Sequence, residues 1–319
     1  MRNNMAFVLA LDAGGTKTLM ALANPQGTVT MLRSGPSLDP TSGVNWQGLL
    51  KQIVAPAIGQ AGLCEAVIGL PFHDELKALS REQNTAASQC IPCPVLVQND
   101  VRIAFDGAFA GTGGVLVLAG TGSMAWASTN GTNDPHFRIG GWGDSFGDEG
   151  SAYWIGRESL ALTGRGIDGR SPTSDFATAL LLEMGIAPDD LIDWVYALEN
   201  KRSSIAAIAR ITGKLADTGN KDAQAILDRA CDCLAEHVNA AQKLLNTGSQ
   251  VPWSYAGGVF DNSYVLNGVR DRIGSEPQRP ALPPIGGGLL RAAQLAGWNT
   301  DHAFIEGLSV SLNTAFQSI

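Results

Sequence analysis

One pattern occurs twice in this chain: a short apolar strand, a turn rich in glycine, threonine and serine, and a second strand. In the first copy, apolar residues 6–11 precede DAGGTKT (12–18), and a second strand is expected over 18–23. In the second copy, residues 114–119 lead into AGTGS (119–123) and then the strand-like MAWAS (124–128). The repetition predicts two loosely related halves, each with a glycine-rich hairpin.

The segments around these hairpins alternate in character. Apolar runs predict further strands over 28–32, 65–70 and 94–98, and helical patterns are expected over 45–61, 73–89 and 99–109. After a strand-like HFRIGGW (136–142), the chain is expected to be mainly helical from residue 149, and 221–247 is its clearest amphipathic segment. A strand at 251–256 and a glycine-rich helix start at 286–297 complete an α/β pattern.

Length and charge restrict the class of protein. The chain has 319 residues, of which 45% are hydrophobic, enough for two domains or one large α/β unit. Its 22 basic and 30 acidic residues give a net charge of −8, which argues against a nucleic acid or an anionic membrane as the main partner. No stretch approaches the roughly 18 apolar residues of a membrane span. The N-terminal apolar run is too short for a secretory signal, so we expect a cytoplasmic protein.

The cysteines and histidines do not form a metal pattern. Cysteines lie at positions 64, 90, 93, 231 and 233, and no second CxxC or histidine pair follows CIPCP at zinc spacing. Reduced structural thiols are therefore expected, and the role of Cys90 and Cys93 stays open.

DAGGTKT allows two interpretations. It could be a tight hairpin only, because glycine tolerates unusual backbone angles and threonine suits strands. It could instead bring backbone N–H groups and the Thr16 hydroxyl close to phosphate oxygens, with Lys17 adding positive charge. Asp12, at the end of the strand, would then help to hold a hydrated Mg²⁺ ion.

The second hairpin strengthens the phosphate interpretation. The segment GTGSMA also fits the dinucleotide fingerprint G-x-G-x-x-[GA], but that fingerprint should open a helix, and a strand is expected here. Two more glycine clusters, AGGVFDN (256–262) and IGGGLLRAA (285–293), are each typical of a helix start close to another backbone. Taken together, the four clusters suggest a cleft for one extended phosphorylated ligand.

GGWGDSFGDEG (140–150) also has more than one interpretation. GDSFG matches the nucleophile elbow of serine hydrolases, but GGWG is a poor end for the strand that such an elbow requires. The alternative is a polar loop in which Asp148 and Glu149 hydrogen bond sugar hydroxyls and Trp142 packs nearby. Asp148 could also cap the helix that follows, and this role is compatible with sugar binding.

Asp100 stands in QND (98–100), directly after a predicted strand. Open α/β folds place their sites at the carboxyl ends of strands, so a carboxylate there could accept the proton of a substrate hydroxyl. Asp100 could also be only an N-terminal helix cap. In a chain with two phosphate hairpins, we favour the catalytic role.

The order of these motifs resembles the BadF/BadG/BcrA/BcrD-type ATPases of the actin, sugar-kinase and Hsp70 superfamily, and most of all their N-acetylglucosamine kinase branch. The similarity runs from about residue 6 to residue 297, and GGWG…GDEGSAYWIG is its most specific part. The resemblance implies an α/β fold with two ribonuclease-H-like domains around a nucleotide cleft. We expect one domain over 1–110, rejoined by a C-terminal helix at about 298–319, and the other over 111–297 with a helical insertion.

The resemblance also implies a role for each motif. Asp100 would be the general base toward the sugar 6-hydroxyl, and Asp12 would hold Mg²⁺ through water. The residues implied to bind ATP are Gly14, Gly15, Thr16, Lys17, Thr18, Gly120, Thr121, Gly122, Ser123, Ala256, Gly257, Gly258, Gly286 and Gly287. The residues implied to line the sugar site, with Asp100, are Ser123, Met124, Gly141, Trp142, Asp148 and Glu149.

The expected function is therefore an ATP- and Mg²⁺-dependent kinase that phosphorylates the 6-hydroxyl of an amino sugar, first of all N-acetylglucosamine. Glucosamine or another amino sugar is an alternative, because neither Asp39 nor Asn45 matches cleanly the asparagine that such kinases carry before the first long helix. The unusual Phe72-His73 pair also leaves the sugar open. A non-catalytic sugar- or nucleotide-binding sensor is the alternative from another class. Exposed helical faces within 149–247 could pair two copies of the chain, or could simply be solvated.

Overall fold

The chain forms two α/β units, each built on a sheet of its own. The structure is a computed structural model that describes residues 6–15, 17–131, 135–172 and 174–318. The first unit takes the chain up to Gly114, together with Ser128–Pro135 and the segment from Arg279 onward. The second unit contains Val115–Ala127 and His136–Gln278.

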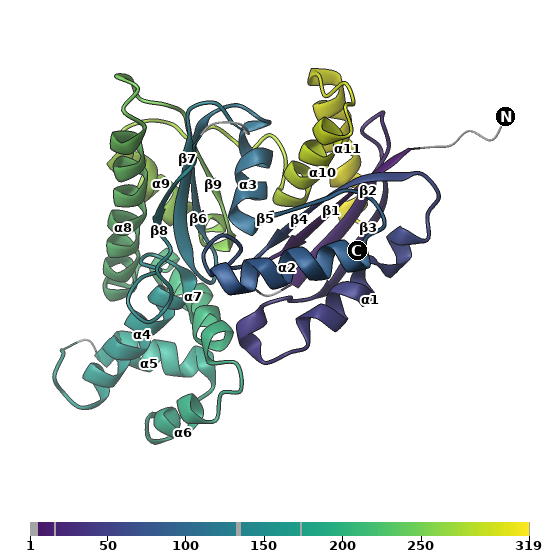
Figure 1. Cartoon of the computed structure of the whole chain (residues 1–319). Coiled ribbons are helices and arrows are strands. Elements are labelled where there is room, and N and C mark those ends of the chain that lie inside the picture. Colours follow the sequence, from purple (N-terminus) through teal and green to yellow (C-terminus); the bar gives the residue numbers. More distant parts are fainter. Residues whose placement is uncertain (1–5, 16, 132–134, 173, 319) are drawn as a thin grey trace. The chain divides into compact units, whose positions relative to one another are not determined.

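The sheet of the first unit has five strands in the order β3-β2-β1-β4-β5 (Figure 1). The strands are β1 (Phe7–Ala13), β2 (Lys17–Ala23), β3 (Val29–Pro36), β4 (Leu63–Leu70) and β5 (Val95–Asn99). The pairs β1–β2 and β2–β3 are antiparallel, whereas β1–β4 and β4–β5 are parallel. The carboxyl ends of β1, β4 and β5 therefore lie at one edge, where open α/β sheets place their sites.

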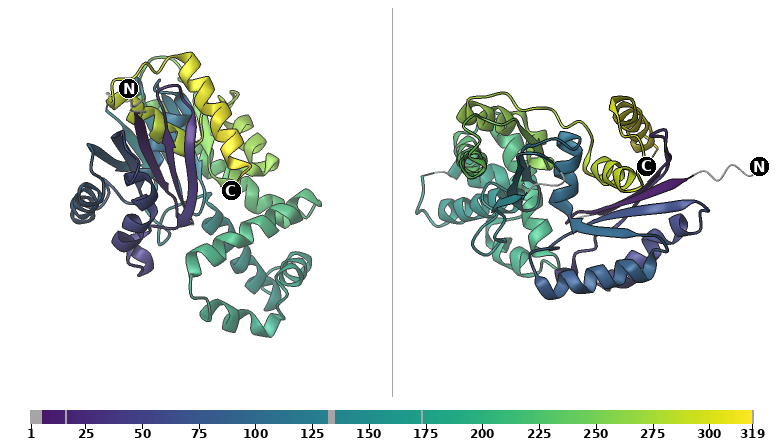
Figure 2. Two further views of the ribbon diagram at one scale, coloured as in Figure 1. Left: turned by 90° about the vertical axis from the view of Figure 1, so that its right-hand side faces the viewer. Right: turned by 45° about the horizontal axis from the view of Figure 1, so that its top comes forward.

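Helices cover both faces of this sheet (Figure 2). They are α1 (Trp46–Ile58) and α2 (Lys77–Cys90) on one face, and α3 (Asp100–Phe109), α10 (Pro284–Leu295) and α11 (His302–Phe316) on the other. The strand β1 is apolar from Phe7 to Leu11 because its side chains pack on both faces of the sheet. Leu9 and Leu11 pack against α1 and α2, whereas Val8 and Ala10 pack against α10 and α11.

The sheet of the second unit has four strands in the order β8-β7-β6-β9. They are β6 (Gly114–Ala119), β7 (Ser123–Ser128), β8 (Phe137–Gly140) and β9 (Trp253–Ala256). The helices of this unit are α4 (Ala152–Ile167), α5 (Ser174–Met184), α6 (Leu191–Tyr196), α7 (Lys201–Asp217), α8 (Lys221–Leu245) and α9 (Ser263–Ile273). The long helix α8 buries its apolar stripe in the core of the unit, as its sequence predicts.

Most elements lie where the apolar pattern predicts them, but two differ. The helix expected from residue 73 begins only at Lys77, because Phe72 and Asp74 adopt left-handed backbone angles that a helix cannot contain. The strand expected over 136–142 ends at Gly140, where two successive glycines, Gly140 and Gly141, have φ of 69°. Short 3₁₀ turns complete the described chain: η1 (Pro40–Ser42), η2 (Pro188–Asp190) and η3 (Gly258–Asp261).

The helix α10 lies in the first unit, although the sequence placed residues up to 297 in the second domain. It crosses α3 at Gly287 and packs on β1 at Gly288. A Cβ on Gly287 would overlap the backbone of Ile103 and Gly107, and one on Gly288 would lie 3.0 Å from the Ala10 Cβ. The glycines thus allow a very close helix contact, and the chain returns to the first unit at Arg279 rather than at residue 298.

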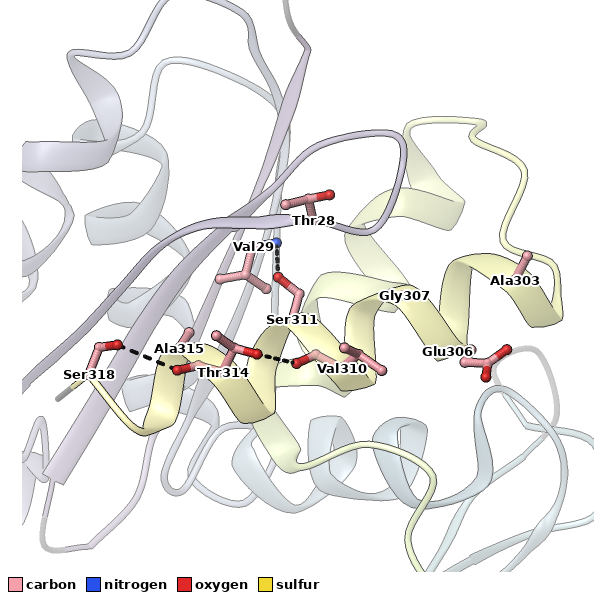
Figure 3. Close-up of a pocket in the computed structure, with 10 residues that line it drawn as sticks. All are labelled: Thr28, Val29, Ala303, Glu306, Gly307, Val310, Ser311, Thr314, Ala315 and Ser318. Atoms are coloured by element: carbon pink, nitrogen blue, oxygen red, sulfur yellow. Dashed lines mark hydrogen bonds between the residues drawn. The ribbon is translucent and has the colours of Figure 1, made fainter.

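A hollow of about 670 Å³ runs along α11 and the turn before β3 (Figure 3). Its wall is made of small and polar side chains such as Ser311, whose Oγ accepts a 2.8 Å hydrogen bond from the Val29 N–H. Among the lining residues that the structure describes, Glu306 is the one ionisable side chain, so these residues do not form a set of catalytic groups. None of the described helices is long and apolar enough to cross a membrane.

Candidate active site

Asp12 lies at the carboxyl end of β1, opposite Leu19 of β2 and Gly69 of β4. Because side chains alternate along a strand, Asp12 points to the same face as Val8 and Ala10. This is the face that α3 and α10 cover.

The hairpin after Asp12 is closed by a hydrogen bond from the Gly14 N–H to the Lys17 carbonyl oxygen, at 3.0 Å. Gly15 and Lys17 are exposed and Gly14 is half-buried, as phosphate-facing groups should be. Thr18 is fully buried, and its hydroxyl has no hydrogen-bond partner. Thr16 lies outside the described residues.

Asp100 opens α3 with no loop between it and β5. The Asn99 side chain caps the helix, since its Oδ1 accepts a 3.0 Å hydrogen bond from the Val101 N–H. The Asp100 carboxylate accepts from the same N–H at 2.9 Å. A Cβ on Gly69 would lie 3.2 Å from the Asp100 Cα, so the missing side chain allows the first turn of α3 to lie close to β4. Gly69 is also the residue of β4 that pairs with Asp12 of β1.

Burial disfavours the ionised forms of Asp12 and Asp100. Burial raises the pKa of Asp100 to about 7, and the negative charges of Asp12 and Glu75 raise it further, against the hydrogen bond from Val101. Burial likewise raises the pKa of Asp12 to about 7, against the opposite effect of Lys17. A carboxylate with a pKa near neutrality is a suitable general base, and strongly shifted carboxylates concentrate at functional sites.

The same two carboxylates fit a divalent cation. Carboxylate oxygens are the protein ligands that Mg²⁺ prefers, and the two acids lack a matching number of nearby cations. Within the described ranges, no cluster of three or more acidic, histidine or cysteine side chains could hold a metal. This arrangement suits an ion whose remaining ligands are water and phosphate oxygens.

The segment from Pro71 to Leu76 holds an unusual shape beside Asn99. Phe72 has φ of 63° and Asp74 has φ of 64°, values that cost energy in residues other than glycine. The Asn99 Nδ2 donates to the carbonyl oxygen of His73 and to Glu75 Oε1, both at 3.0 Å. The residue that caps α3 therefore also holds this strained segment in place.

In the second unit, the turn between β6 and β7 lies on the first turn of α4. The N–H groups of Ala152 and Tyr153 donate to the carbonyl oxygens of Gly120 and Thr121, at 2.8 and 3.3 Å. The Ser123 hydroxyl donates to the Glu149 carbonyl oxygen at 2.6 Å. The hairpin is thus joined to the segment that the sequence assigns to sugar binding.

The cap of α4 is Ser151, whose Oγ accepts a hydrogen bond from the Trp154 N–H at 3.1 Å. Asp148 is therefore not the cap that the sequence allowed. Its backbone is left-handed, with φ of 54°, and its carboxylate pairs with Arg202 at 2.7 Å. Burial raises the pKa of Asp148, whereas Arg202 and the N–H groups of Gly143 and Ser123 lower it.

The loop before α4 exposes an aromatic surface. Trp142 is 66% exposed, and the Arg138 guanidinium lies 5.7 Å from the centre of its ring. Met124 is buried beside Gly141, where a Cβ would approach the Met124 Cε to 2.6 Å. An exposed indole over a close-packed glycine is a suitable surface for the apolar face of a sugar ring.

Two alternatives from the sequence do not fit the structure. GDSFG lies in a turn between β8 and α4, with a hydrogen bond from the Gly147 N–H to the Gly143 carbonyl oxygen, so Ser145 is not at a strand-to-helix elbow. GTGSMA runs into β7 rather than into a helix, as expected, which excludes the dinucleotide fingerprint.

The remaining sequence candidates are scattered over both units. Gly257 and Gly258 are exposed just after β9, beside Ala256. Gly286 and Gly287 are buried in α10, where close packing against Leu312 of α11 and against the backbone of α3, respectively, accounts for them without a ligand. Asp39 caps η1 and Asn45 caps α1, so both side chains have local structural roles.

The cysteines are all free in the structure. Burial raises the pKa of Cys93 to about 11 and that of Cys231 to about 12. Both thiols are therefore protonated at neutral pH, which makes them poor nucleophiles and poor metal ligands.

Three residues of the site were not identified from the sequence: Gly69, Arg202 and Asn99 in its double bonding role. Gly69 stands inside an apolar strand, and Arg202 lies in an ordinary amphipathic helix, far along the chain from its partner Asp148. No local pattern marks either residue. The sequence does place Asn99 or Asp100 at the start of this helix, and Asn99 is the cap, but its second bonds to His73 and Glu75 carry no local signal.

Comparison with known families identifies the family of the chain. Residues 9–285 match the model of the BadF/BadG/BcrA/BcrD ATPase family. The chain belongs to this family. The match covers most of the chain, and it confirms the resemblance that the motifs indicated.

Two relatives are sugar kinases by name. The N-acetylmuramic acid/N-acetylglucosamine kinase of Clostridium acetobutylicum is 27% identical over 267 residues, which cover 81% of this chain and 87% of that protein. The N-acetyl-D-glucosamine kinase of Dictyostelium discoideum is 27% identical over 177 residues, 54% of each chain.

Solved structures confirm the fold. A protein from Chromobacterium violaceum, described as a candidate N-acetylglucosamine kinase, superposes with a TM-score of 0.71 at 24% identity, covering 90% of this chain and 99% of that one. A ROK-family glucokinase from Streptomyces griseus, solved with glucose and AMPPNP, gives a TM-score of 0.59 at 15% identity, covering 92% and 99%. The expected two-domain, actin-like α/β fold is confirmed.

Proposed function

We propose that this chain is an ATP-dependent kinase that phosphorylates the 6-hydroxyl of an amino sugar, with N-acetylglucosamine as the first candidate. Membership of an ATPase family and two relatives named as sugar kinases support the reaction class. The single observation that carries the proposal is the position of Asp100, which opens α3 at the carboxyl edge of the sheet with a pKa raised to about 7.

Asp100 would act as the general base. It accepts the proton of the sugar hydroxyl as the hydroxyl oxygen forms its bond to the γ-phosphorus of ATP. The bond between that phosphorus and the bridging oxygen breaks, ADP leaves with the electron pair, and the proton passes from Asp100 to solvent. Phosphoryl transfer depends mainly on positioning and charge, so a base that is fixed by a helix cap contributes to both.

Both hairpins would bind phosphate oxygens. In the first, Gly14, Gly15 and Lys17 are accessible, whereas Thr18 is buried and would contribute only after the hairpin has moved. In the second, the candidates are Gly120, Thr121, Gly122 and Ser123. Exposed Gly257 and Gly258, with Ala256, would border the adenosine, whereas the buried Gly286 and Gly287 of α10 would not contact it directly.

Mg²⁺ would be held by Asp12, through water. The ion neutralises charge on the phosphates when bound. The residues present fit this role. Asp12 and Asp100 place two negative charges near each other when ionised, and the Lys17 ammonium is the positive charge that lowers the pKa of Asp12.

The sugar would be bound by Asp100 and by the second hairpin and the loop before α4. Trp142 offers an exposed ring, and Asp148 and Glu149 offer oxygens for hydroxyl groups. Ser123, Met124 and Gly141 shape the surface beside them. Glucosamine is an alternative substrate, and N-acetylmuramic acid is another because one relative carries its name.

The decisive experiment is a coupled ADP-release assay with N-acetylglucosamine, glucosamine, N-acetylmuramic acid and 6-deoxy-N-acetylglucosamine. We expect turnover of at least one of the first three and none of the 6-deoxy sugar, with the product identified as the 6-phosphate by phosphorus NMR. Asp100→Asn should keep ATP binding and lose about 10²–10⁴-fold in kcat. Near-normal kcat in that variant would contradict the role of Asp100.

A non-catalytic sensor with the same fold is the competing function. It would bind ATP and a sugar tightly without releasing ADP. The shifted pKa of Asp100 favours the enzyme, because a sensor needs no proton acceptor at the strand edge.

A further inference from the structure

The Asp148 carboxylate lies where three separate parts of the second unit meet. The Arg202 Nη2, from the first turn of α7, donates a hydrogen bond to Oδ2 at 2.7 Å. The backbone N–H groups of Ser123, at the start of β7, and of Gly143, in the loop before α4, lower the pKa of this carboxyl group. Asp148 is only 3% exposed and has a left-handed backbone, so its position is tightly constrained.

We propose that Arg202 is a positioning residue of the kinase: its guanidinium holds Asp148 where that carboxylate joins the β6–β7 hairpin to the loop 141–149. The inference rests on the proposed function, in which the hairpin binds phosphate and the loop binds the sugar. Arg202 itself need not touch either ligand.

The geometry is specific to this pair. A Cβ on Gly122 would lie 2.8 Å from the Asp148 Oδ2 and 2.9 Å from the Arg202 Nη2. The ion pair therefore lies directly against the backbone of the hairpin, and it fits there because Gly122 has no side chain. The helix α7 thus braces the phosphate hairpin through one charged contact.

The charges around Asp148 explain the arginine at position 202. Burying a carboxylate without a cation beside it costs free energy, and removing the cation from a buried ion pair strongly destabilises the fold. Arg202 supplies the compensating charge, and Asp144 lies 3.6 Å from its Nε on another side. A planar guanidinium can be held between two carboxylates in this way, whereas the point charge of a lysine cannot keep the same orientation.

The carboxylate also keeps capacity for a ligand. An ionised carboxylate has about four acceptor positions, and Arg202 occupies one of them with a short hydrogen bond. A sugar hydroxyl could occupy another. A sugar bound at Asp148 would thus be linked through the same side chain to the Ser123 N–H of the phosphate hairpin.

The consequence is reciprocal coupling between the two ligands. If each ligand orders the same three-way junction, then nucleotide should tighten the binding of sugar, and sugar should tighten the binding of nucleotide by the same factor. Removing Arg202 should reduce this factor toward one.

The test compares Arg202→Met with Arg229→Met in the full-length chain. Arg229 is a matched control, because it also pairs with a carboxylate of the second unit, Glu158, at 2.9 Å, and lies over Trp154. Sugar affinity is measured by calorimetry with and without AMPPNP, and kcat and KM are measured for both substrates. We expect Arg202→Met to lose the AMPPNP effect on sugar binding and about 10²-fold in kcat, because small misplacements of binding groups cost that much. Arg229→Met should behave like the wild type.

Two further variants keep the test decisive if Arg202→Met folds poorly. Arg202→Lys retains the charge, so it should melt close to the wild type and still show weakened coupling. Arg202→Met combined with Asp148→Asn removes the unpaired charge and should also fold, again without coupling. Wild-type coupling and kcat in any of these variants, or equal losses in Arg229→Met, would overturn the inference. A wild-type chain that binds no sugar at all would instead refute the proposed function, and the inference with it.

Discussion

Asp12 and Asp100 are acids held where their charge is disfavoured. Both lie at the carboxyl edge of the first sheet, and burial raises the pKa of each to about 7. The negative charge of Asp12 raises the pKa of Asp100 as well. A folded protein tolerates such groups when they serve a reaction, at some expense in stability. The pH dependence of unfolding should therefore report on them directly.

The sign of that dependence follows from proton binding. Asp100 has a pKa of about 7 in the folded chain and an ordinary value near 3.8 when unfolded, so the folded state binds more protons between these values. The stability that this proton contributes is present at acid pH and is lost as the pH rises toward and through 7.

We therefore expect Asp100→Asn to melt several degrees above the wild type at pH 8 in metal-free buffer, and close to it at pH 5. Thermal melting at the two pH values, with the exposed acid variant Asp217→Asn as control, measures this difference. An equal shift at both pH values would mean that the Asp100 carboxylate does not titrate as described.

At the scale of elements, the junction between β5 and α3 holds Asp100, the proposed base. Asn99 caps α3 through Oδ1 and holds the segment with Phe72 and Asp74 through Nδ2, so one side chain fixes both the base and the strained turn beside it. Strain of this kind persists only where the surroundings determine the conformation.

Asn99→Ala should therefore affect activity more than its effect on stability implies. Loss of a cap costs about 0.5–2 kcal/mol, and the His73 carbonyl oxygen and Glu75 lose a donor as well. We expect a fall in kcat of about tenfold or more, because Asp100 is no longer fixed.

The matched control is Asn220→Ala, which removes the cap of α8, where Oδ1 accepts from the Asp222 and Ala223 N–H groups. That variant should lose similar stability in denaturant unfolding while keeping kcat. A similar loss of kcat in both variants would show that α3 needs only a stable start, and not Asn99 in particular.

Local patterns in the sequence predicted the elements and much of the candidate site. Buried strands such as β1 and β6 are continuous apolar runs, and α8 has a regular helical stripe, so each could be located from spacing alone. The left-handed turn at Phe72 could not, because nothing in the residue itself favours that backbone. The Arg202–Asp148 pair joins residues 54 positions apart, and only the folded unit brings them together.

At the scale of the whole molecule, the first unit is built mainly from the N-terminal and C-terminal parts of the chain, and the second unit from the part between them. The helices α10 and α11 cover one face of the first sheet, where they bury Val8, Ala10 and Val67. The sequence-based boundary at residue 297 missed this return, because the glycines of α10 resemble a ligand-binding motif and in fact allow contact with α3. The first unit therefore depends on residues that are far from it in the sequence.

Two truncations test this dependence. A chain that ends after Gln278 lacks α10 and α11, so the apolar face of the first sheet is left uncovered and this unit should not fold. A chain that ends after Trp298 lacks only α11, and it loses the burial of Phe304, Leu308 and Leu312, worth roughly 1.5–3 kcal/mol each. It should be folded but markedly less stable.

Limited proteolysis with mass spectrometry distinguishes these outcomes. In the chain that ends at Gln278, we expect rapid cleavage within residues 6–114 and slow cleavage within the second unit, whose core residues all lie between Val115 and Val269. Supplying residues 279–319 as a separate segment should restore protection of the first unit. Full protection of residues 6–114 in the shortened chain would mean that the first sheet is stable with one face uncovered, contrary to the burial of Leu289, Leu290 and Leu308 against it.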